Sequence, residues 1–289
     1  MADGAHEVTI NDEEVPVTGE PGIDVAKCIS SSVFTDWVSS VDPAFLVERV
    51  HLQSVDMFGP NIGFMKFRAD TFDRESHAFL PGIVFMRGGS VGILTILVAE
   101  ESGDEYAIAV RQPRLPIGSF ESLEIPAGML DGSGNFAGKA ASEMKEETGI
   151  QVTNGDLVDL TEMVQGGKGH KGVWLSPGGS DEFMRFFLYR KKWPKAEIEA
   201  LEGKLTGLRE SGELIKLTVL PYEDLIAAPD GKTLCAIALY DRMCGPLPPP
   251  HLFATAPDCL AAAQARSVTG CFVEVRTDVA AVGSLYIVN

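Results

Sequence analysis

The sequence is short of basic residues, of histidines and of paired cysteines, and each shortage excludes a class of function. Its 24 Lys and Arg stand against 41 Asp and Glu, which gives a net charge of −17 and no basic patch suited to a nucleic-acid backbone. The five histidines are scattered and no HExxH motif is present, so zinc is not indicated. The five cysteines form no CxxC pair, which predicts reduced thiols in a reducing compartment.

Long apolar runs are also missing. The longest, such as residues 92–99, are far too short to span a bilayer, so we expect no membrane partner. Residues 1–14 are acidic and have no apolar core, unlike a secretory signal or an Arg- and Ser-rich transit peptide. Whether a transit peptide has been removed stays open. With 45% hydrophobic and 22% charged residues, the 289-residue chain has the balance of a globular protein with one large or two small domains.

A run of carboxylates in the segment Lys139 to Glu147 says most about the chemistry. The segment contains good helix formers and no proline, and Gly149 follows it as a helix-ending glycine. At 3.6 residues per turn, one helix face carries Glu143, Glu146 and Glu147. These carboxylates repel one another unless a hard divalent cation such as Mg²⁺ neutralises them. An isolated run of this kind is more often a solvated surface, so its surroundings decide between the two readings.

The surroundings form a motif. The segment from Pro126 to Ile150, PAGMLDGSGNFAGKAASEMKEETGI, resembles the Nudix box, G-x5-E-x7-R-E-U-x-E-E-x-G-U, where U is aliphatic. The matching positions are Gly128, Glu143, Met144, Glu146, Glu147, Gly149 and Ile150. Two positions depart from the box, because Gly134 replaces its first Glu and Ser142 replaces its Arg. In the family this pair braces the loop against the helix; both halves are absent here, and Asp131 is close enough to supply a substitute carboxylate.

Two flanking motifs extend the resemblance. Upstream, VRQPRLPIG at residues 110–118 leads into LEIPAG at residues 123–128, which is similar to the sugar-nucleotide branch of the Nudix hydrolases. Downstream, SPGGSDE at residues 176–182 resembles the mobile catalytic loop of that branch. A narrower resemblance to plant-type ADP-sugar diphosphatases rests on VDMFGPNIG at residues 55–63 and on residues 234–240.

The resemblance implies a set of metal ligands. Glu143 and Glu147 would be the main ligands of Mg²⁺, with Mn²⁺ as the alternative ion. Glu146 would assist catalysis directly or through a bound water, and its alternative role is a solvated surface charge. The carbonyl of Ala127, in the tight Pro-Ala-Gly turn, would add a further ligand.

The resemblance also implies groups that act on the substrate. Glu182 follows a Gly-Gly turn and would activate or orient the attacking water as general base, with Asp181 next in line. Side chains that could bind phosphate oxygens are Arg87, Arg111, Gln112 and Arg114. An arginine fork matches phosphate oxygens, although such residues can equally be ordinary surface charges or loop acids.

The order of elements predicts an α/β (α+β) fold, the Nudix α/β/α sandwich, with a small N-terminal β-rich module. We expect a dimerisation module at residues 1–82, a Nudix hydrolase domain at 83–245 and a C-terminal extension at 246–289, weakly ordered rather than an added strand. Strands are expected at residues 50–72 around a turn at 59–63, and at 83–87, 91–99, 107–110, 123–125, 151–164, 173–176, 183–189 and 215–220. Helices are expected at residues 24–41, 139–147, 193–207 and 232–244.

The function implied by the resemblance is that of a nucleoside diphosphate-sugar diphosphatase. We expect Mg²⁺-dependent hydrolysis of the diphosphate bond of an ADP-sugar, ADP-glucose first and ADP-ribose second. The products would be AMP and sugar 1-phosphate or ribose 5-phosphate. The alternative is a catalytically silent nucleotide-sugar binder or scaffold with a degenerate box. The resemblance also implies a homodimer and a plastid location; without it, the chain reads as cytoplasmic.

Overall fold

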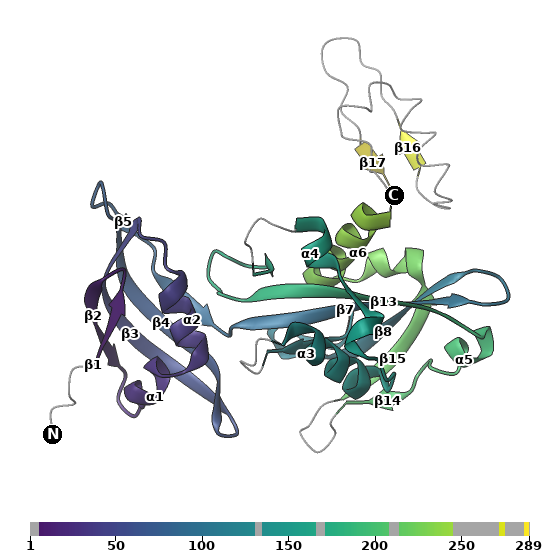
Figure 1. Ribbon diagram of the computed structural model, residues 1–289, viewed down its shortest axis with the longest axis horizontal. Helices are drawn as coiled ribbons and strands as arrows, with labels where there is room; N and C mark the ends of the chain where they lie inside the picture. The colour runs from purple at the N-terminus through teal and green to yellow at the C-terminus, as the bar shows by residue number, and fades with distance from the viewer. Residues whose placement is uncertain are drawn as a thin grey trace, which may run out of the picture.

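A computed structural model of the chain describes residues 6–130, 135–165, 171–207, 214–244, 272–274 and 286–288. Two large β-sheets lie next to each other in this part of the chain, each with helices packed on it (Figure 1). A third sheet pairs only β16 (Phe272–Glu274) with β17 (Tyr286–Val288), and the rest of the predicted C-terminal extension, residues 246–289, lies outside the described residues. Within the described residues, no helix has both the length and the apolar character needed to cross a membrane.

The first sheet is built from the N-terminal part of the chain. Its strands are β1 (His6–Ile10), β2 (Glu13–Gly19), β3 (Phe45–Phe58), β4 (Asn61–Asp73), β5 (Phe79–Leu80) and β6 (Ile83–Met86). Strands β3 and β4 form a long hairpin, as the sequence predicts, and β6 pairs with β4. Phe34, Leu52 and Phe67 are fully buried in the core between this sheet and its helices. The predicted domain boundary after residue 82 stays a prediction. In the structure, β6 pairs with β4, so the first sheet continues beyond that residue.

Two short helices replace the single one expected at residues 24–41. They are α1 (Val25–Ile29) and α2 (Ser32–Ser40). Asp24 caps α1 as predicted, because its side chain accepts a hydrogen bond from Lys27 N at 3.0 Å. Ser31 then caps α2 by accepting from Phe34 N at 3.4 Å. This second cap explains why the helix restarts rather than runs through.

The second sheet contains the remaining long strands. They are β7 (Gly89–Ala99), β8 (Glu105–Arg114), β9 (Ser119–Glu124), β10 (Ala127–Met129), β11 (Leu157–Asp159), β12 (Val173–Trp174), β13 (Phe183–Trp193), β14 (Leu205–Thr206) and β15 (Ile215–Pro221). Strand β7 is central and buried throughout from Ser90 to Ala99, as its unbroken apolar run requires. It pairs in parallel with β13, from Phe183 opposite Gly89 to Trp193 opposite Ala99. Each predicted strand from 83–87 to 215–220 overlaps an observed strand, although only residues 157–159 of the one predicted at 151–164 are in a strand.

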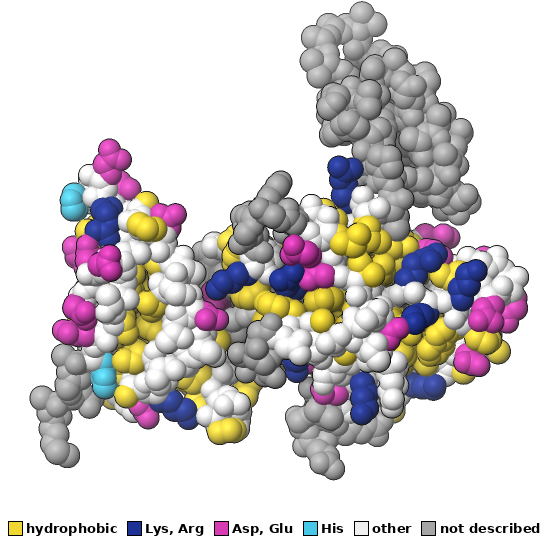
Figure 2. Space-filling view, in the orientation of Figure 1, with side chains coloured by type: hydrophobic (Ala, Val, Ile, Leu, Met, Phe, Trp, Pro, Cys, Tyr) yellow, Lys and Arg dark blue, Asp and Glu magenta, His cyan; other side chains and the backbone are white. Residues whose placement is uncertain are grey.

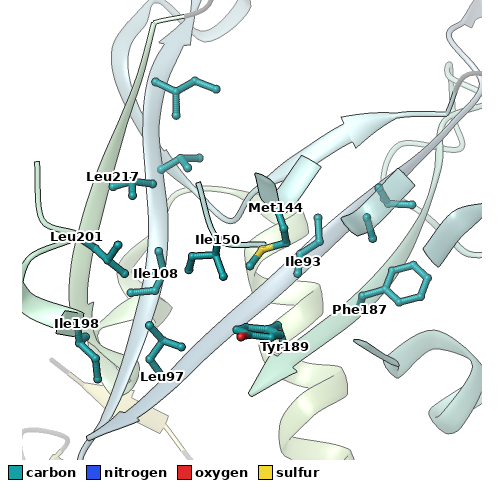
Figure 3. Close-up of a cluster of buried hydrophobic side chains, with 14 of the residues drawn as sticks. Ile93, Leu97, Ile108, Met144, Ile150, Phe187, Tyr189, Ile198, Leu201 and Leu217 are labelled. Atoms are coloured by element: carbon teal, nitrogen blue, oxygen red, sulfur yellow. The ribbon is translucent and has the colours of Figure 1, made fainter. Parts of the chain in front are cut away.

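Helices cover both faces of the second sheet, so the predicted α/β/α sandwich is confirmed. On one face, α3 (Phe136–Glu143) and α5 (Lys195–Glu199) pack on a cluster that includes Ile93, Phe187 and Leu217 (Figure 3). On the other face, α4 (Leu160–Gln165) and α6 (Gly231–Cys244) pack on a separate cluster. The prediction of a helix at residues 232–244 is correct.

Two predicted elements are wrong. The strand expected at residues 151–164 is a 3₁₀ turn, η3 (Asn154–Asp156), followed by β11 and α4. Polar side chains break it, since Asp156 accepts from Thr153 N at 2.9 Å and Asp159 accepts from Glu162 N at 2.8 Å. The helix expected at residues 193–207 is only α5, because β13 continues to Trp193 and the chain then joins β14 beside β15.

Candidate active site

The turn at residues 126–128 is fixed between a strand and a helix. Ile93 N on β7 donates to the carbonyl of Pro126 at 2.8 Å. Ala127 N donates to Glu147 Oε2 at 3.0 Å, so the Glu147 carboxylate lies against the Ala127 peptide. Glu147 is only 6% exposed. The sequence motif thus places one of its predicted metal ligands beside the turn that carries another.

Glycine at position 128 leaves space for a second carboxylate. A Cβ atom on Gly128 would lie 1.9 Å from Glu143 Oε1 and 2.0 Å from Glu143 Cδ, so the Glu143 carboxylate would have to leave its place. The missing side chain therefore makes room for the Glu143 carboxylate, which is 7% exposed as a residue. Glu143 and Glu147 both reach the same tight turn, as the predicted ligand set requires.

The helix that carries the glutamates changes its winding within the motif. It is α-helical as α3 up to Glu143, then continues as a π-helix, η2 (Met144–Thr148), and ends at Gly149 with φ +75°. A π-turn within a helix is common at functional sites. Ser142, at the position of the family's arginine, donates from Oγ to Glu146 Oε1 at 2.8 Å. The half-buried Glu146 is therefore held by its own helix.

The donor set fits a hard divalent cation. Glu143, Glu147 and the Ala127 carbonyl offer only oxygen atoms, which Mg²⁺ and Mn²⁺ prefer. Two nearly buried carboxylates on one helix also need a neighbouring positive charge. Lys139 supplies one at present, with Nζ 2.6 Å from Glu143 Oε1. Within the described residues, no group of three or more His, Cys, Asp or Glu side chains is gathered as a metal site. An ion bound at Glu143 would lie close to the Lys139 ammonium group.

The loop at residues 176–182 brings a further acidic group to the site. Glu182 Oε1 accepts from Ser90 Oγ at 3.3 Å and lies 3.4 Å from an Arg87 guanidinium nitrogen. Arg87, predicted to bind substrate, thus lies beside the predicted general base. Asp181 is turned the other way, since its carboxylate accepts backbone N–H groups of Arg87 and Gly88. Burial raises the pKa of Asp181, although these N–H groups oppose the rise.

Strand β7 brings the loop and the box helix together. Ser90 stands in register with Met129 of β10 on one side and with Met184 of β13 on the other. Met129 directly follows the turn that holds Glu143 and Glu147, and Met184 follows Glu182 by two residues. The predicted metal ligands and the predicted base therefore lie at the same end of β7.

A buried ion network supports the strand that enters the turn. Glu124, only 3% exposed, accepts from Arg114 Nε at 2.9 Å and from a terminal Arg114 nitrogen at 2.7 Å, and it also binds Lys232. Asp230 lies 3.1 Å from Lys232 Nζ. Burial alone would raise the pKa of Glu124, but the hydrogen bonds of Arg114 and the charge of Lys232 outweigh it and lower the pKa to about 2. Arg114, predicted to bind phosphate, commits two nitrogens to this network.

The other predicted phosphate contacts lie on β8. Arg111 and Gln112 stand opposite Leu123 and Ser122 of β9. An Arg111 guanidinium nitrogen is 3.5 Å from the Glu121 carbonyl, a long contact at the surface. Gln112 Nε2 is buried and has no hydrogen-bond partner among the described residues. Both side chains remain predicted substrate contacts.

The sequence analysis missed Glu124 and Lys232. The available signal was a glutamate at an inward position of a strand, because a buried charge needs a partner. Its partner Lys232 begins α6, 108 residues along the chain, and no local pattern joins the two. Thr233, the next residue, also supports the turn by accepting from Ile125 N at 3.0 Å.

The Glu124 network should make stability depend on acidity. Because the pKa of Glu124 is lowered in the folded chain, its stabilisation is present above the ordinary pKa of 4.5 and is lost as the pH falls towards about 2. At pH 6, Glu124→Gln should lower the free energy of unfolding by about 3 kcal/mol, since it leaves Lys232 and Arg114 without their buried partner. At pH 3 that difference should shrink by roughly half.

Urea unfolding of both proteins at the two pH values measures this difference. Glu121→Gln is the matched control, because Glu121 is an exposed carboxylate on the same strand. The control should change the unfolding free energy little at either pH. An equal Glu124→Gln effect at pH 6 and pH 3 would contradict the ionised network.

Comparison with known proteins identifies the family of this chain. Residues 86–237 match the family model of the NUDIX domain. Nudix hydrolase 14, chloroplastic, of Arabidopsis thaliana is 43% identical over 242 residues, which cover 79% of this chain and 77% of that protein. A solved structure described as an ADP compounds hydrolase aligns with 14% identity and a TM-score of 0.47, over 71% of this chain and 96% of that one. Because the family match covers more than half of the chain, the protein belongs to the NUDIX domain family and is a Nudix hydrolase homologue.

Proposed function

We propose that this Nudix hydrolase cleaves the diphosphate bond of ADP-sugars in a Mg²⁺-dependent reaction. ADP-glucose is the first candidate substrate and ADP-ribose the second, with AMP and sugar 1-phosphate or ribose 5-phosphate as products. The observation that carries the proposal is the pair of buried carboxylates, Glu143 and Glu147, against the Ala127 turn.

The metal would be held by the box segment. Glu143, Glu147 and the Ala127 carbonyl would bind Mg²⁺, with Mn²⁺ as the alternative, and Glu146 would assist from the same helix. When bound, the ion would neutralise phosphate oxygens and lower the pKa of the attacking water. Lys139, whose Nζ lies 2.6 Å from Glu143 Oε1, would stand beside the ion and add positive charge to this side of the site.

The proton of the attacking water would pass to Glu182. Its carboxylate is held by Ser90 and lies beside Arg87, so it points into the same end of β7 as the metal ligands. Arg87 Nε is buried without a hydrogen-bond partner among the described residues, which leaves an N–H group for a substrate oxygen. Arg111, Gln112 and the remaining nitrogen of Arg114 would add donors along β8. Lys and Arg side chains are spread over the half of the molecule built on the second sheet, interspersed with acidic ones (Figure 2).

The competing function is a catalytically silent nucleotide-sugar binder. It is motivated by the two departures from the box, of which Gly134 lies outside the described residues and Ser142 bonds to Glu146. A binder has no need for two buried carboxylates that repel each other. The name of the Arabidopsis relative also favours the hydrolase.

The proposal is tested by an assay of phosphate release coupled to a phosphatase. The substrates are ADP-glucose, ADP-ribose, UDP-glucose and NADH, each with and without Mg²⁺. We expect turnover of ADP-sugars that disappears with a chelator and returns with Mg²⁺. Binding of ADP-glucose without turnover in any metal would favour the silent binder instead.

We also propose that the enzyme works in a plastid, because the Arabidopsis relative is named chloroplastic. A fluorescent fusion of the full natural protein, expressed in leaf cells, should coincide with chlorophyll fluorescence. A signal spread through the cytoplasm would overturn this location.

The protein is further proposed to be a homodimer that associates through the first sheet. Of the apolar segment 64–67 on which the expectation rested, Met65 and Phe67 are buried in the core and unavailable. Large exposed apolar side chains elsewhere on this sheet are Phe45, Met57, Phe58, Phe79, Ile83 and Phe85. These side chains are spread along the sheet from one end of β3 to the other, and a partner chain that covered them would remove apolar surface from water.

Light scattering should give the mass of two chains at micromolar concentration. Ile83→Lys should shift the mass towards one chain, because Ile83 is 61% exposed on β6 and a charge there would oppose burial. Leu115→Lys is the matched control, since Leu115 is 88% exposed but lies beyond β8 in the second sheet. If the wild-type protein has the mass of one chain and is fully active, the proposed homodimer is wrong.

A further inference from the structure

We propose that Asp181 is a positioning residue that fastens the Glu182 loop to the linker between the two sheets. This inference rests on the proposed role of Glu182 as the group that handles the proton of water. Asp181 was the alternative base by sequence, yet its carboxylate faces the backbone of Arg87 and Gly88. Its effect on the reaction would come from where it holds its neighbour.

The linker offers a binding site for one carboxylate. Arg87 N donates to Asp181 Oδ1 at 2.8 Å, and Gly88 N lies 3.3 Å from Oδ1 and 3.2 Å from Oδ2. Two successive N–H groups that converge in this way form an anion-binding concavity when one residue is left-handed. Gly88 is left-handed, with φ +75°. The Asp181 carboxylate therefore occupies this concavity.

The rest of the loop is held by backbone atoms. Phe85 N donates to the Gly179 carbonyl at 2.7 Å, and Phe85 forms an isolated parallel bridge with Ser180. The loop closes on itself as Ser180 N donates to the Ser176 carbonyl at 3.0 Å. Any sequence could make these contacts. Asp181 adds an attachment that depends on a particular side chain, directly before Glu182.

The same linker connects the first sheet to the site. Arg87 lies between β6 of the first sheet and β7 of the second. Its guanidinium carbon is 5.5 Å from the centre of the Phe64 ring on β4, and one of its nitrogens is 3.4 Å from Glu182 Oε1. By holding the Arg87 backbone, Asp181 fixes both the loop and the cation beside Glu182. Loss of this attachment should therefore misplace Glu182 rather than unfold the chain.

The test compares Asp181→Ala with Asp181→Asn. Asn keeps an oxygen that can accept the Arg87 N–H, whereas Ala keeps none. We expect Asp181→Ala to lower kcat about 10- to 100-fold with little change in KM, because small misplacements of a reacting group cost this much. Asp181→Asn should recover most of kcat. Amide hydrogen exchange at Arg87 and Gly88 should accelerate in the Ala variant and stay near wild type in the Asn variant.

Two further variants control the comparison. Asp224→Ala, an exposed acid on the 3₁₀ helix η5 (Tyr222–Ala227), should change neither kcat nor this exchange. Gly88→Ala should reproduce the kcat loss of Asp181→Ala, since φ +75° strains any side chain and its Cβ would lie 2.8 Å from Val33 Cγ1. If Asp181→Ala fails to fold, Gly88→Ala and Asp181→Asn still carry the test.

The outcomes separate this inference from the function on which it rests. Unchanged exchange at Arg87 and Gly88 in Asp181→Ala, or faster exchange with unchanged kcat, overturns the positioning role. If kcat falls equally in both Asp181 variants, by about 1,000-fold or more, the positioning role is also overturned, because Asp181 would then be the base itself. If Glu182→Gln keeps full kcat, the role of Glu182 fails, while faster exchange in Asp181→Ala would still show that the loop is fastened here.

Discussion

Glu147→Gln should nearly abolish turnover and leave the fold intact. Gln matches the volume of Glu and can still accept the Ala127 N–H, so the turn keeps its support. What is lost is a charge on a nearly buried predicted metal ligand, and metal stabilisation of the transition state is worth several kcal/mol. We expect kcat at saturating Mg²⁺ to fall by about 10³-fold or more, with weaker Mg²⁺ binding in calorimetry.

The metal-free protein provides the control for folding. Its melting temperature should be unchanged or higher in Glu147→Gln, because the repulsion between Glu147 and Glu143 is relieved. Glu121→Gln, an exposed change on β9, should leave both Mg²⁺ binding and kcat as in wild type. Retention of more than half of the wild-type kcat by Glu147→Gln at saturating Mg²⁺ would falsify the metal role.

Glu182→Gln should lower kcat with a smaller effect on KM. The carboxylate is held by Ser90 and lies beside Arg87, and Gln can keep the first contact while it loses the ability to take a proton. Loss of a general base typically costs about 10² to 10⁴ in rate. Steady-state kinetics on the preferred ADP-sugar measures both parameters.

A matched change away from the site separates chemistry from charge. Glu223→Gln removes an exposed carboxylate from η5 and should leave kcat and KM unaltered. If Glu182→Gln changes KM alone, Glu182 positions the substrate and the base lies elsewhere. That result would also show that the loop matters for binding rather than for proton transfer.

The sequence was sufficient where a pattern is local and strong. The apolar run of β7 and the helix at residues 232–244 followed from periodicity, and the predicted box helix starts and ends close to its observed bounds. Gly128 and the two glutamates were found from their spacing, which the turn and helix then bring together. The catalytic roles of these residues remain predictions.

Other features depended on contacts that local patterns do not encode. The residues of the π-helical segment Met144–Thr148 would equally suit an α-helix, so the sequence does not indicate the change in winding. The strand expected at residues 151–164 failed because Asp156 and Asp159 bond to nearby backbone, and such bonds compete with sheet pairing. The partners of Glu124 lay on separate elements, one of them 108 residues away.

The parallel pairing of β7 with β13 has a consequence for how the protein matures. The contacts that join the Glu182 loop to the linker and to β7 span 94 and 92 residues, whereas the box helix forms from neighbours. Long-range parallel pairing is slow because a large loop must close before any contact rewards it. The acidic helix should therefore form early in folding and the loop should join it late. A nascent chain that has not yet emerged past residue 182 would possess the predicted metal ligands and still lack the predicted proton acceptor.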